Sequence, residues 1–288
     1  MSDLRPRRSV LYMPAANERA LDKAKGIPAD ALIFDLEDAV APDAKPDARR
    51  NAVAAALSGE YGNKEITIRC NGLDTQWGHE DLAAAAMANV SAVVIPKINS
   101  VKEVEAVSSA LASAGAPGSM KIWAMIETPT AIFDVRQIAA HPRVQTLVMG
   151  TNDLAKELRA TQVRGRAPLT PHLATALLAA REAGKVILDG VFNDVKDLDA
   201  FRDECVQGAQ MGFDGKTLIH PSQVEIANDV WAPSADEVDY AQRVIAAFEE
   251  ATAEGRGVIT VDGRMIENLH VDNARRVLAV QAAIESLS

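Results

Sequence analysis

Two carboxylates stand at the ends of consecutive apolar runs and could share a metal ion. Glu127 closes the run that begins at Lys121, and Asp153 closes the run that begins at Thr146. If these runs are neighbouring strands of a parallel barrel, their ends lie roughly 5 Å apart. An oxygen-only pair suits Mg²⁺, which keeps several waters and takes one or two protein carboxylates together with substrate oxygens. The alternative is a pair of rim carboxylates that bond to backbone amides or to Arg and Lys.

A guanidinium and a group of acids occur where two other runs end. Arg69 follows an Ile-Thr-Ile segment, and a guanidinium there can bind a carboxylate through two N–H groups. It could equally be a structural partner of Glu37 or Asp38, and the two roles are compatible. One acid of the Asp35–Asp38 segment could orient a metal-bound water or act as a base, although solvated surface is the usual explanation for such a segment. The residues together predict a metal site beside an anion clamp.

Other polar residues have weaker signals. His220 lies between an apolar run and a proline, where it could bind substrate or transfer a proton. A hydrogen-bonded structural role is the other interpretation. Arg19, Lys23 and Lys25 fall on an expected first helix and would attract a phosphorylated tail such as that of coenzyme A. Their alternative is a solvated helix face. The sequence contains neither Gly-x-Gly-x-x-Gly nor a Walker-type loop.

The elements that would position these residues alternate regularly along the chain. Helix-like stretches separate eight apolar runs, a pattern that predicts a (β/α)8 barrel with its site in the loops after the strands. We expect one barrel over residues 1–230 and a helical extension over 231–288, either closing the barrel floor or packing on a neighbouring subunit. The runs are Ser9–Pro14, Ala31–Asp35, Ile66–Asn71, Ala92–Lys97, Lys121–Glu127, Thr146–Asp153, Val186–Gly190 and Thr217–Pro221.

Composition narrows the class of protein. The chain has 288 residues, a formal net charge of −10 and a pI near 5.1, which argues against nucleic acid as a partner. Cys70 and Cys205 provide no disulfide framework and fit a reducing cytosol. Pro14 and Asn17 interrupt the first apolar stretch too early for a signal peptide or a membrane span. We therefore expect a cytoplasmic protein that is not bound to a membrane.

Seven short motifs resemble, in this order, those of the citrate lyase β-subunit-like family. This family includes malyl-CoA lyases and malyl-CoA thioesterases and belongs to the metal-dependent HpcH/HpaI-type aldolases. The resemblance covers essentially the whole chain. Its motifs are RSVLYMP (8–14), FDLEDAV (34–40), IRCN (68–71), IPK (95–97), MIETP (125–129), GTNDL (150–154) and LIHP (218–221).

The resemblance implies a TIM barrel that forms trimers, sometimes paired into hexamers. It implies Mg²⁺ on Glu127 and Asp153, and a substrate carboxylate on Arg69. It also implies a pocket in which Tyr12, Arg19 and Lys23 lie along the CoA and the backbone around Asn152, Asp153, Ile219 and His220 forms the lining.

One position departs from the family pattern. Relatives usually carry an Asp after Met-Ile in the C-terminal segment, where it reaches a neighbour's site as acid or base, but this chain has Glu267 after Met265-Ile266. The side chain is one methylene longer. A shift of about 1 Å can cost roughly 10²-fold in rate, so we expect carbon–carbon lysis to be impaired.

The resulting prediction is a Mg²⁺-dependent enzyme acting on the CoA thioester of a small dicarboxylic hydroxy acid. The favoured reaction is hydrolysis of (3S)-malyl-CoA to malate and CoA, with Glu37, Asp38, Arg69 and Glu267 as catalytic residues. One alternative is a malyl-CoA or citramalyl-CoA lyase that releases acetyl-CoA and glyoxylate, and another is an aldolase of free 2-keto acids. A further alternative, of a different class, is a non-catalytic acyl-CoA-binding or citrate lyase complex subunit.

Overall fold

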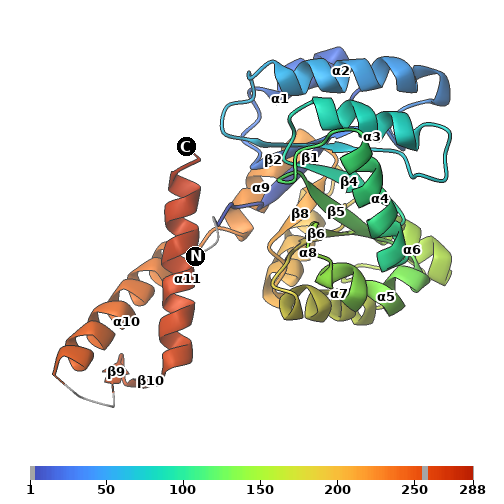
Figure 1. Cartoon of the computed structure of the whole chain (residues 1–288). Helices are drawn as coiled ribbons and strands as arrows, with labels where there is room; N and C mark the ends of the chain where they lie inside the picture. Colours follow the sequence, from blue (N-terminus) through green and yellow to red (C-terminus); the bar gives the residue numbers. More distant parts are fainter. Residues whose placement is uncertain (1–3, 255–258, 288) are drawn as a thin grey trace. The chain divides into compact units, whose positions relative to one another are not determined.

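The apolar runs form the strands of a closed parallel barrel in the computed structural model, which describes residues 4–254 and 259–287 (Figure 1). Each strand pairs with its neighbours in sequence, and β8 pairs with β1 to close the barrel. The predicted TIM-type barrel is therefore confirmed. Its strands are β1 Ser9–Pro14, β2 Ala31–Asp35, β3 Glu65–Arg69, β4 Ala92–Ile95, β5 Lys121–Ile126, β6 Val144–Met149, β7 Val186–Asp189 and β8 Gly215–Leu218.

Helices cover the outside of the barrel, and several begin where the sequence provides a capping side chain. Asn17 Oδ1 accepts a hydrogen bond from the backbone of Ala20, and Thr128 Oγ1 accepts one from Ala131. Pro129 then occupies the first helical position, where its missing N–H has no partner to lose. The helices are α1 Glu18–Ala24, α2 Lys45–Leu57, α3 Gly78–Met87, α4 Val101–Ser113, α5 Pro129–Ala140, α6 Thr151–Leu158, α7 Thr170–Glu182, α8 Leu198–Met211 and α9 Val224–Val230, with short 3₁₀ turns η1 Pro42–Ala44 and η2 Pro221–Gln223.

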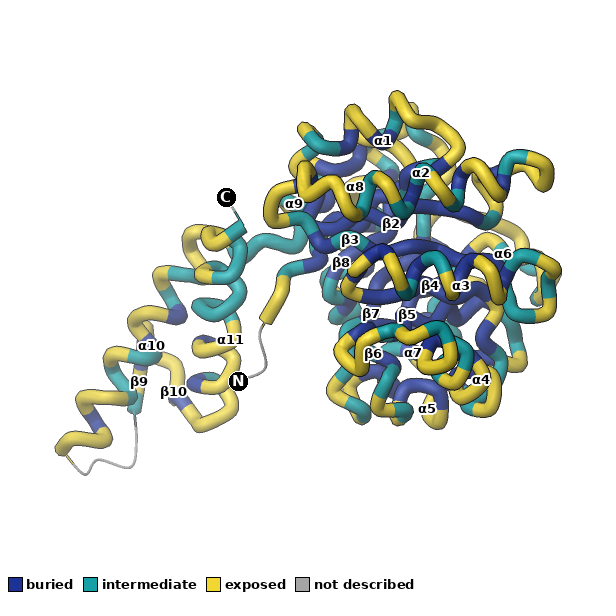
Figure 2. The backbone as a smooth tube through the Cα atoms, turned by 45° about the horizontal axis from the view of Figure 1, so that its top comes forward, coloured by how far each residue is buried: buried dark blue, intermediate teal, exposed yellow. Residues whose placement is uncertain are grey.

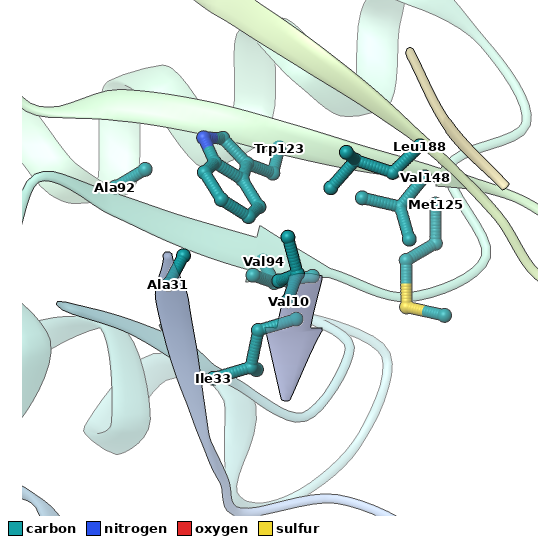
Figure 3. Close-up of a cluster of buried hydrophobic side chains, with 9 residues drawn as sticks. All are labelled: Val10, Ala31, Ile33, Ala92, Val94, Trp123, Met125, Val148 and Leu188. Atoms are coloured by element: carbon teal, nitrogen blue, oxygen red, sulfur yellow. The ribbon is translucent and has the colours of Figure 1, made fainter. Parts of the chain in front are cut away.

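The interior of the barrel is filled by apolar side chains from six of its strands. Alternate residues of a strand point to opposite faces, so one set fills the barrel and the other packs under the helices. The strands are accordingly buried on both faces, whereas the helices expose their outer faces (Figure 2). Figure 3 shows the interior cluster, with Trp123 as its largest member: Val10, Ala31, Ile33, Ala92, Val94, Trp123, Met125, Val148 and Leu188.

The set of residues that face the barrel interior continues along each strand to its carboxyl-terminal end. Trp123 and Met125 face the interior, so the next residue of that set is Glu127. In the same way Ile33 leads to Asp35, whose Cα partner in the neighbouring strand is Arg69. The barrel therefore brings charged side chains together at one end.

Several strand ends differ from those of the expected runs, by most in β6 and β8. β8 begins at Gly215 rather than at Thr217. A side chain would not fit at position 215, because a Cβ on Gly215 would lie 1.8 Å from the carbonyl oxygen of Arg7. β6 ends at Met149, and Asp153 lies beyond it in the first turn of α6. The two proposed metal-binding carboxylates therefore come from a strand end and from a helix start.

The second compact unit is formed by residues after Asn228 together with the N-terminal residues up to Pro6. It contains α10 Ala235–Ala253 and α11 Asn268–Glu285, which confirms C-terminal helices. Between them, the glycine-containing segment 258–263 predicts a turn. The described part forms instead a hairpin of β9 Ile259–Val261 and β10 Arg264–Ile266, while Val258 lies outside the described residues.

The core of this second unit is separate from that of the barrel. It consists of Ala241, Val244, Val261, Ile266, Val271 and Ala274. None of the described helices, in either unit, is both long and apolar enough to cross a membrane.

Candidate active site

A cavity of about 360 Å³ opens at the carboxyl-terminal rim of the barrel. Its lining includes several residues that the sequence singled out: Tyr12, Asp38, Arg69, Glu127, Asn152, Asp153 and Ile219. A second cavity of about 700 Å³ lies beside it and shares Thr151, Asn152, Val191 and Asn193 with it. The smaller cavity contains the buried acids and Arg69, so it is the candidate active site.

Arg69 is held rigidly by acids that precede it in the sequence. Its Nε and Nη2 atoms each donate to one oxygen of Asp35 at 2.7 Å, and Nη1 lies 2.7 Å from Glu37 Oε2. Asp38 is farther away, at 3.7 Å, and is exposed. The guanidinium also lies over the ring of Tyr12, 4.7 Å from its centroid. The structural role of Arg69 is therefore observed with Asp35 and Glu37, while N–H groups remain on Nη1 and Nη2 and its role as an anion clamp stays a prediction.

Asp35 is a site residue that the sequence analysis did not select. It is almost completely buried and takes the whole Nε–Nη2 edge of Arg69. Glu37 is less buried, and one of its oxygens has ion-pair distance to Arg69 but no well-directed hydrogen bond. Burial raises the pKa of Glu37, and Asp38 and Asp35 add to the shift, while Arg69 opposes it. Asp38 lines the rim cavity, whereas Glu37 lines a separate cavity of about 370 Å³, and the role of either acid as a base stays a prediction.

Glu127 is only 4% exposed at the base of the cavity. Its Oε1 accepts a hydrogen bond of 2.7 Å from the backbone N–H of Lys97. Burial raises its pKa to about 7, with Glu37 and Asp153 adding to the shift against the Lys97 hydrogen bond and Arg69. A Cβ on Gly150 would lie 2.1 Å from Glu127 Oε2, so glycine at that position leaves the carboxylate its space. The buried charge of Glu127 is thus poorly compensated.

Asp153 and Glu127 both contact Lys97, Asp153 through the side-chain ammonium and Glu127 through the backbone N–H. The ammonium of Lys97 lies 3.3 Å from Asp153 Oδ2, in an ion pair that solvent reaches from both sides. Lys97 belongs to a motif noted in the sequence, but the sequence analysis did not place it in the site. No spacing rule links it to Glu127, which lies thirty residues away, so no local signal could have found this contact.

The donor set fits a divalent cation bound at an open site. Glu127 and Asp153 are hard oxygen donors, and the poorly compensated charge of Glu127 would be neutralised by a cation. Within residues 4–254 and 259–287, no group of three or more His, Cys, Asp or Glu side chains forms a ready-made metal cage. A Mg²⁺ site needs no such cage, because Mg²⁺ uses one or two carboxylates and completes its shell with water and substrate oxygens.

The remaining predicted residues lie around the mouth or elsewhere. Arg19 and Lys23 are exposed on α1 and outside the lining of the cavity. Asn152 is exposed and forms a reciprocal amide pair with Asn193. His220 does not line the cavity: its Nδ1 lies 2.8 Å from Ser222 Oγ and accepts from the Ser222 N–H at the start of η2. The geometry of His220 favours the structural interpretation.

Glu267 belongs to the second unit, where it immediately precedes α11. Its backbone N–H donates to His270 Nδ1 at 3.0 Å, and its side chain is exposed. Its role as an acid or base stays a prediction.

A second group of charged side chains lies outside the barrel wall, under the helices. We call it the β7–β8 ion cluster: Arg166, Asp189, Glu204 and Lys216. Lys216 Nζ lies 2.9 Å from Asp189 and 2.8 Å from Glu204, and Arg166 Nη1 donates to Asp189 at 2.7 Å. Asp189 and Lys216 have no exposed surface. The two acids and two bases balance, so this cluster needs no further cation.

Comparison with known proteins gives consistent matches along the chain. The model of the HpcH/HpaI aldolase/citrate lyase family matches residues 8–221. A (3S)-malyl-CoA thioesterase of Cereibacter sphaeroides is 50% identical over 279 residues, which are 97% of this chain and 96% of the relative. The citrate lyase subunit beta of Escherichia coli K12 is 36% identical over 96% of this chain and 93% of its own length.

The solved structures include a relative with bound ligands. The protein CitE of Mycobacterium tuberculosis, in complex with magnesium, acetoacetate and coenzyme A, is 28% identical and superimposes with a TM-score of 0.79 over 97% of this chain and 100% of its own. A citrate lyase beta subunit of M. tuberculosis, complexed with oxaloacetate and magnesium, is 29% identical and superimposes with a TM-score of 0.68 over 79% of this chain and 98% of its own.

Proposed function

Because this chain belongs to the HpcH/HpaI aldolase/citrate lyase family, we propose that it is an enzyme that hydrolyses (3S)-malyl-CoA to malate and CoA. The observation that carries the proposal is the 50% identity with (3S)-malyl-CoA thioesterases over nearly the full length of both chains. The rim cavity supports it, since it combines buried carboxylates with an anchored guanidinium. A thioester of a small hydroxy dicarboxylic acid presents the complementary groups, namely a terminal carboxylate and neutral oxygens.

In the proposed complex Arg69 binds the terminal carboxylate of the malyl group. Asp35 and Glu37 hold the guanidinium in place, so little side-chain freedom is lost when the substrate binds. Glu127 and Asp153 would hold Mg²⁺, which supplies Lewis-acid polarisation of substrate oxygens when it is bound. Arg19 and Lys23, exposed on α1, would attract the phosphates of CoA.

Glu37 is the proposed base of the hydrolytic step. Its raised pKa makes its carboxylate a better proton acceptor than an ordinary Glu. Glu37 takes a proton from water as the water oxygen bonds to the thioester carbonyl carbon. The carbon–sulfur bond then breaks, the thiolate takes the proton from Glu37, and malate and CoA are released. Asp38, which is more exposed, would assist by keeping the water hydrogen bonded.

The test is a product assay with purified protein, malyl-CoA and Mg²⁺. Malate and free CoA should form in equal amounts, with little glyoxylate, and chelation with EDTA should stop the reaction. Glu127→Gln and Asp153→Asn should each reduce kcat/KM by about 10³-fold, because each removes a charge from the proposed metal site. Asp203→Asn, at an exposed ion pair with Arg164, serves as the matched control and should retain the parent rate. Metal-independent turnover, or full activity in both site variants, would refute the proposal.

Carbon–carbon lysis is the second candidate, favoured by the similarity to the citrate lyase β subunits. It would use the same binding mode but would need a proton delivered to the enolate of acetyl-CoA. If the longer side chain of Glu267 impairs protonation of this enolate, Glu267→Asp should raise the ratio of glyoxylate to malate. Glyoxylate formed in step with acetyl-CoA by the parent protein would replace hydrolysis with lysis as the activity.

We propose a cytoplasmic homotrimer in which the unit carrying Glu267 packs on a neighbouring subunit. The two free, buried cysteines of the described chain support a reducing compartment. Light scattering should give three copies, or six if trimers pair. Mixing inactive Glu127→Gln and Glu267→Ala proteins should restore part of the activity, because some sites would then combine two intact contributions. A monomer, or no restoration after subunit exchange, would rule the shared site out.

A further inference from the structure

Lys97 contacts both carboxylates of the proposed metal site. Its backbone N–H donates to Glu127 at 2.7 Å, and its side-chain nitrogen lies 3.3 Å from Asp153. One residue thus connects two acids that come from different elements of the barrel. The first contact uses the main chain and survives any substitution except proline, whereas the second depends on the ammonium.

The backbone of Lys97 is in the left-handed region, with φ of 50°. This conformation is strained for a residue with a side chain, and such residues persist where surrounding contacts hold them. Here Pro96 is buried on one side and Ile98 on the other, and the N–H is directed at Glu127. The starting point of the Lys97 side chain is therefore fixed beside the two acids.

Of the two bases at the site, Lys97 is the one that solvent reaches. In the described part of the chain, ion pairs join Asp35, Glu37 and Asp38 to Arg69 and join Asp153 to Lys97, so these four acids and the nearby Glu127 meet two bases. Arg69 is nearly buried and committed to Asp35, whereas the Lys97 side chain is 55% exposed. An ion pair this accessible contributes little stability, so it can be broken at small cost.

We propose that Lys97 competes with the divalent cation for Asp153: its ammonium neutralises this carboxylate in the metal-free protein and is displaced when the metal binds. The inference rests on the proposed metal site at Glu127 and Asp153. Two cations cannot share one carboxylate without repulsion, so Lys97 lowers the metal affinity that the bare pair of acids would have.

The structure also provides a place for the displaced ammonium. A third cavity of about 370 Å³ is lined by Lys97 together with Glu37, Asp74 and Glu103. In this proposal the ammonium turns into that acid-lined space when it leaves Asp153, while the backbone hydrogen bond from Lys97 to Glu127 is kept.

Calorimetric titration of the full-length, EDTA-treated protein with MgCl₂ alone tests this inference without any measurement of activity. Lys97→Met removes the charge at nearly the same length and should lower the Kd for Mg²⁺ about 3- to 10-fold at low salt. Lys97→Arg keeps the charge and should stay within about twofold of the parent. Lys102→Met changes the net charge equally at an exposed position of α4 and should also stay within about twofold.

The outcomes separate this inference from the metal site itself. If the parent protein binds Mg²⁺ and Glu127→Gln does not, the proposed metal site is supported. The affinity of Lys97→Met for Mg²⁺ then tests the competition. An unchanged or weaker affinity in Lys97→Met, confirmed with Lys97→Gln should the first variant fold poorly, overturns the competition. If the parent binds no Mg²⁺, both the metal site and the competition are wrong. An affinity gain that disappears as salt rises supports the inference, because the Lys97 charge is half exposed.

Discussion

The rim site and the β7–β8 ion cluster both bring buried acids together with bases, but their charges are balanced differently. In the ion cluster, Asp189 and Glu204 meet Arg166 and Lys216, one base for each acid. Although burial raises it, the pKa of Asp189 ends below its ordinary value because Lys216 and Arg166 stabilise the charged form. In the rim site, burial raises the pKa of Glu127 to about 7.

Burial alone therefore does not distinguish a structural acid from a functional one. Asp189 is the more deeply buried of the two carboxylates, yet its pKa is the lower. The difference lies in the partners, because bases around Asp189 offset its desolvation whereas further acids surround Glu127. An excess of buried acid favours the binding of a cation. A buried cluster in which each acid has a base needs no cation.

The largest expected effect comes from unbalancing the ion cluster. Lys216→Met leaves Asp189 and Glu204 with Arg166 as their only neighbouring base, and removal of one partner of a buried pair costs about 3–5 kcal/mol. Urea unfolding of the metal-free protein should show this loss. Arg164→Met, at the exposed pair with Asp203, is the control and should cost less than about 1 kcal/mol. A loss below about 1 kcal/mol in Lys216→Met would contradict the structural role of the cluster.

An intermediate effect of opposite sign is expected in the rim site. Glu127→Gln removes a poorly compensated buried charge and keeps an oxygen that can accept the Lys97 N–H. The free energy of unfolding at pH 8 in EDTA should therefore rise by roughly 1–3 kcal/mol. Saturating Mg²⁺ should stabilise the parent and not the variant. If Glu127→Gln is destabilised in EDTA, the surrounding groups stabilise the charge of Glu127. That outcome would contradict the poor compensation of this charge in the rim site.

The smallest effect is the pH dependence that separates the two regions. The pKa of Glu127 is raised in the folded protein, so between its ordinary value and about 7 the folded state binds more proton than the unfolded state. Stability is therefore lost as pH rises through 7, and the advantage of Glu127→Gln should shrink by about 1 kcal/mol per pH unit from 7 down to 5.

The contribution of the ion cluster to the free energy of unfolding should not change with pH between 5 and 8. The pKa of Asp189 is lowered, so its contribution is present above its ordinary value of 3.8 and is lost only as pH falls below that value. The difference in unfolding free energy between the parent and Asp189→Asn should stay constant from pH 8 to pH 5. A difference that changes over this range would show that Asp189 titrates with the rim site.

The sequence alone was sufficient for the barrel and for most of its site. Apolar runs of strand length, separated by helical stretches, require a parallel sheet covered on both faces, and the polar residue after each run must then lie at one rim. Glu127 and Arg69 were found in this way because their positions follow from the two-residue alternation of a strand. The hairpin of β9 and β10 was missed, since three-residue strands give too short a pattern to distinguish from a turn.

Only the tertiary structure decided which charges meet. The contacts of Lys97 with Glu127 and Asp153, and of Asp35 with Arg69, join residues from different strands and loops. The balance of the β7–β8 ion cluster also depends on four residues from four separate segments. Local patterns report which face a side chain occupies, but the energy of a charge depends on every neighbour within a few ångströms, and closure of the barrel selects those neighbours.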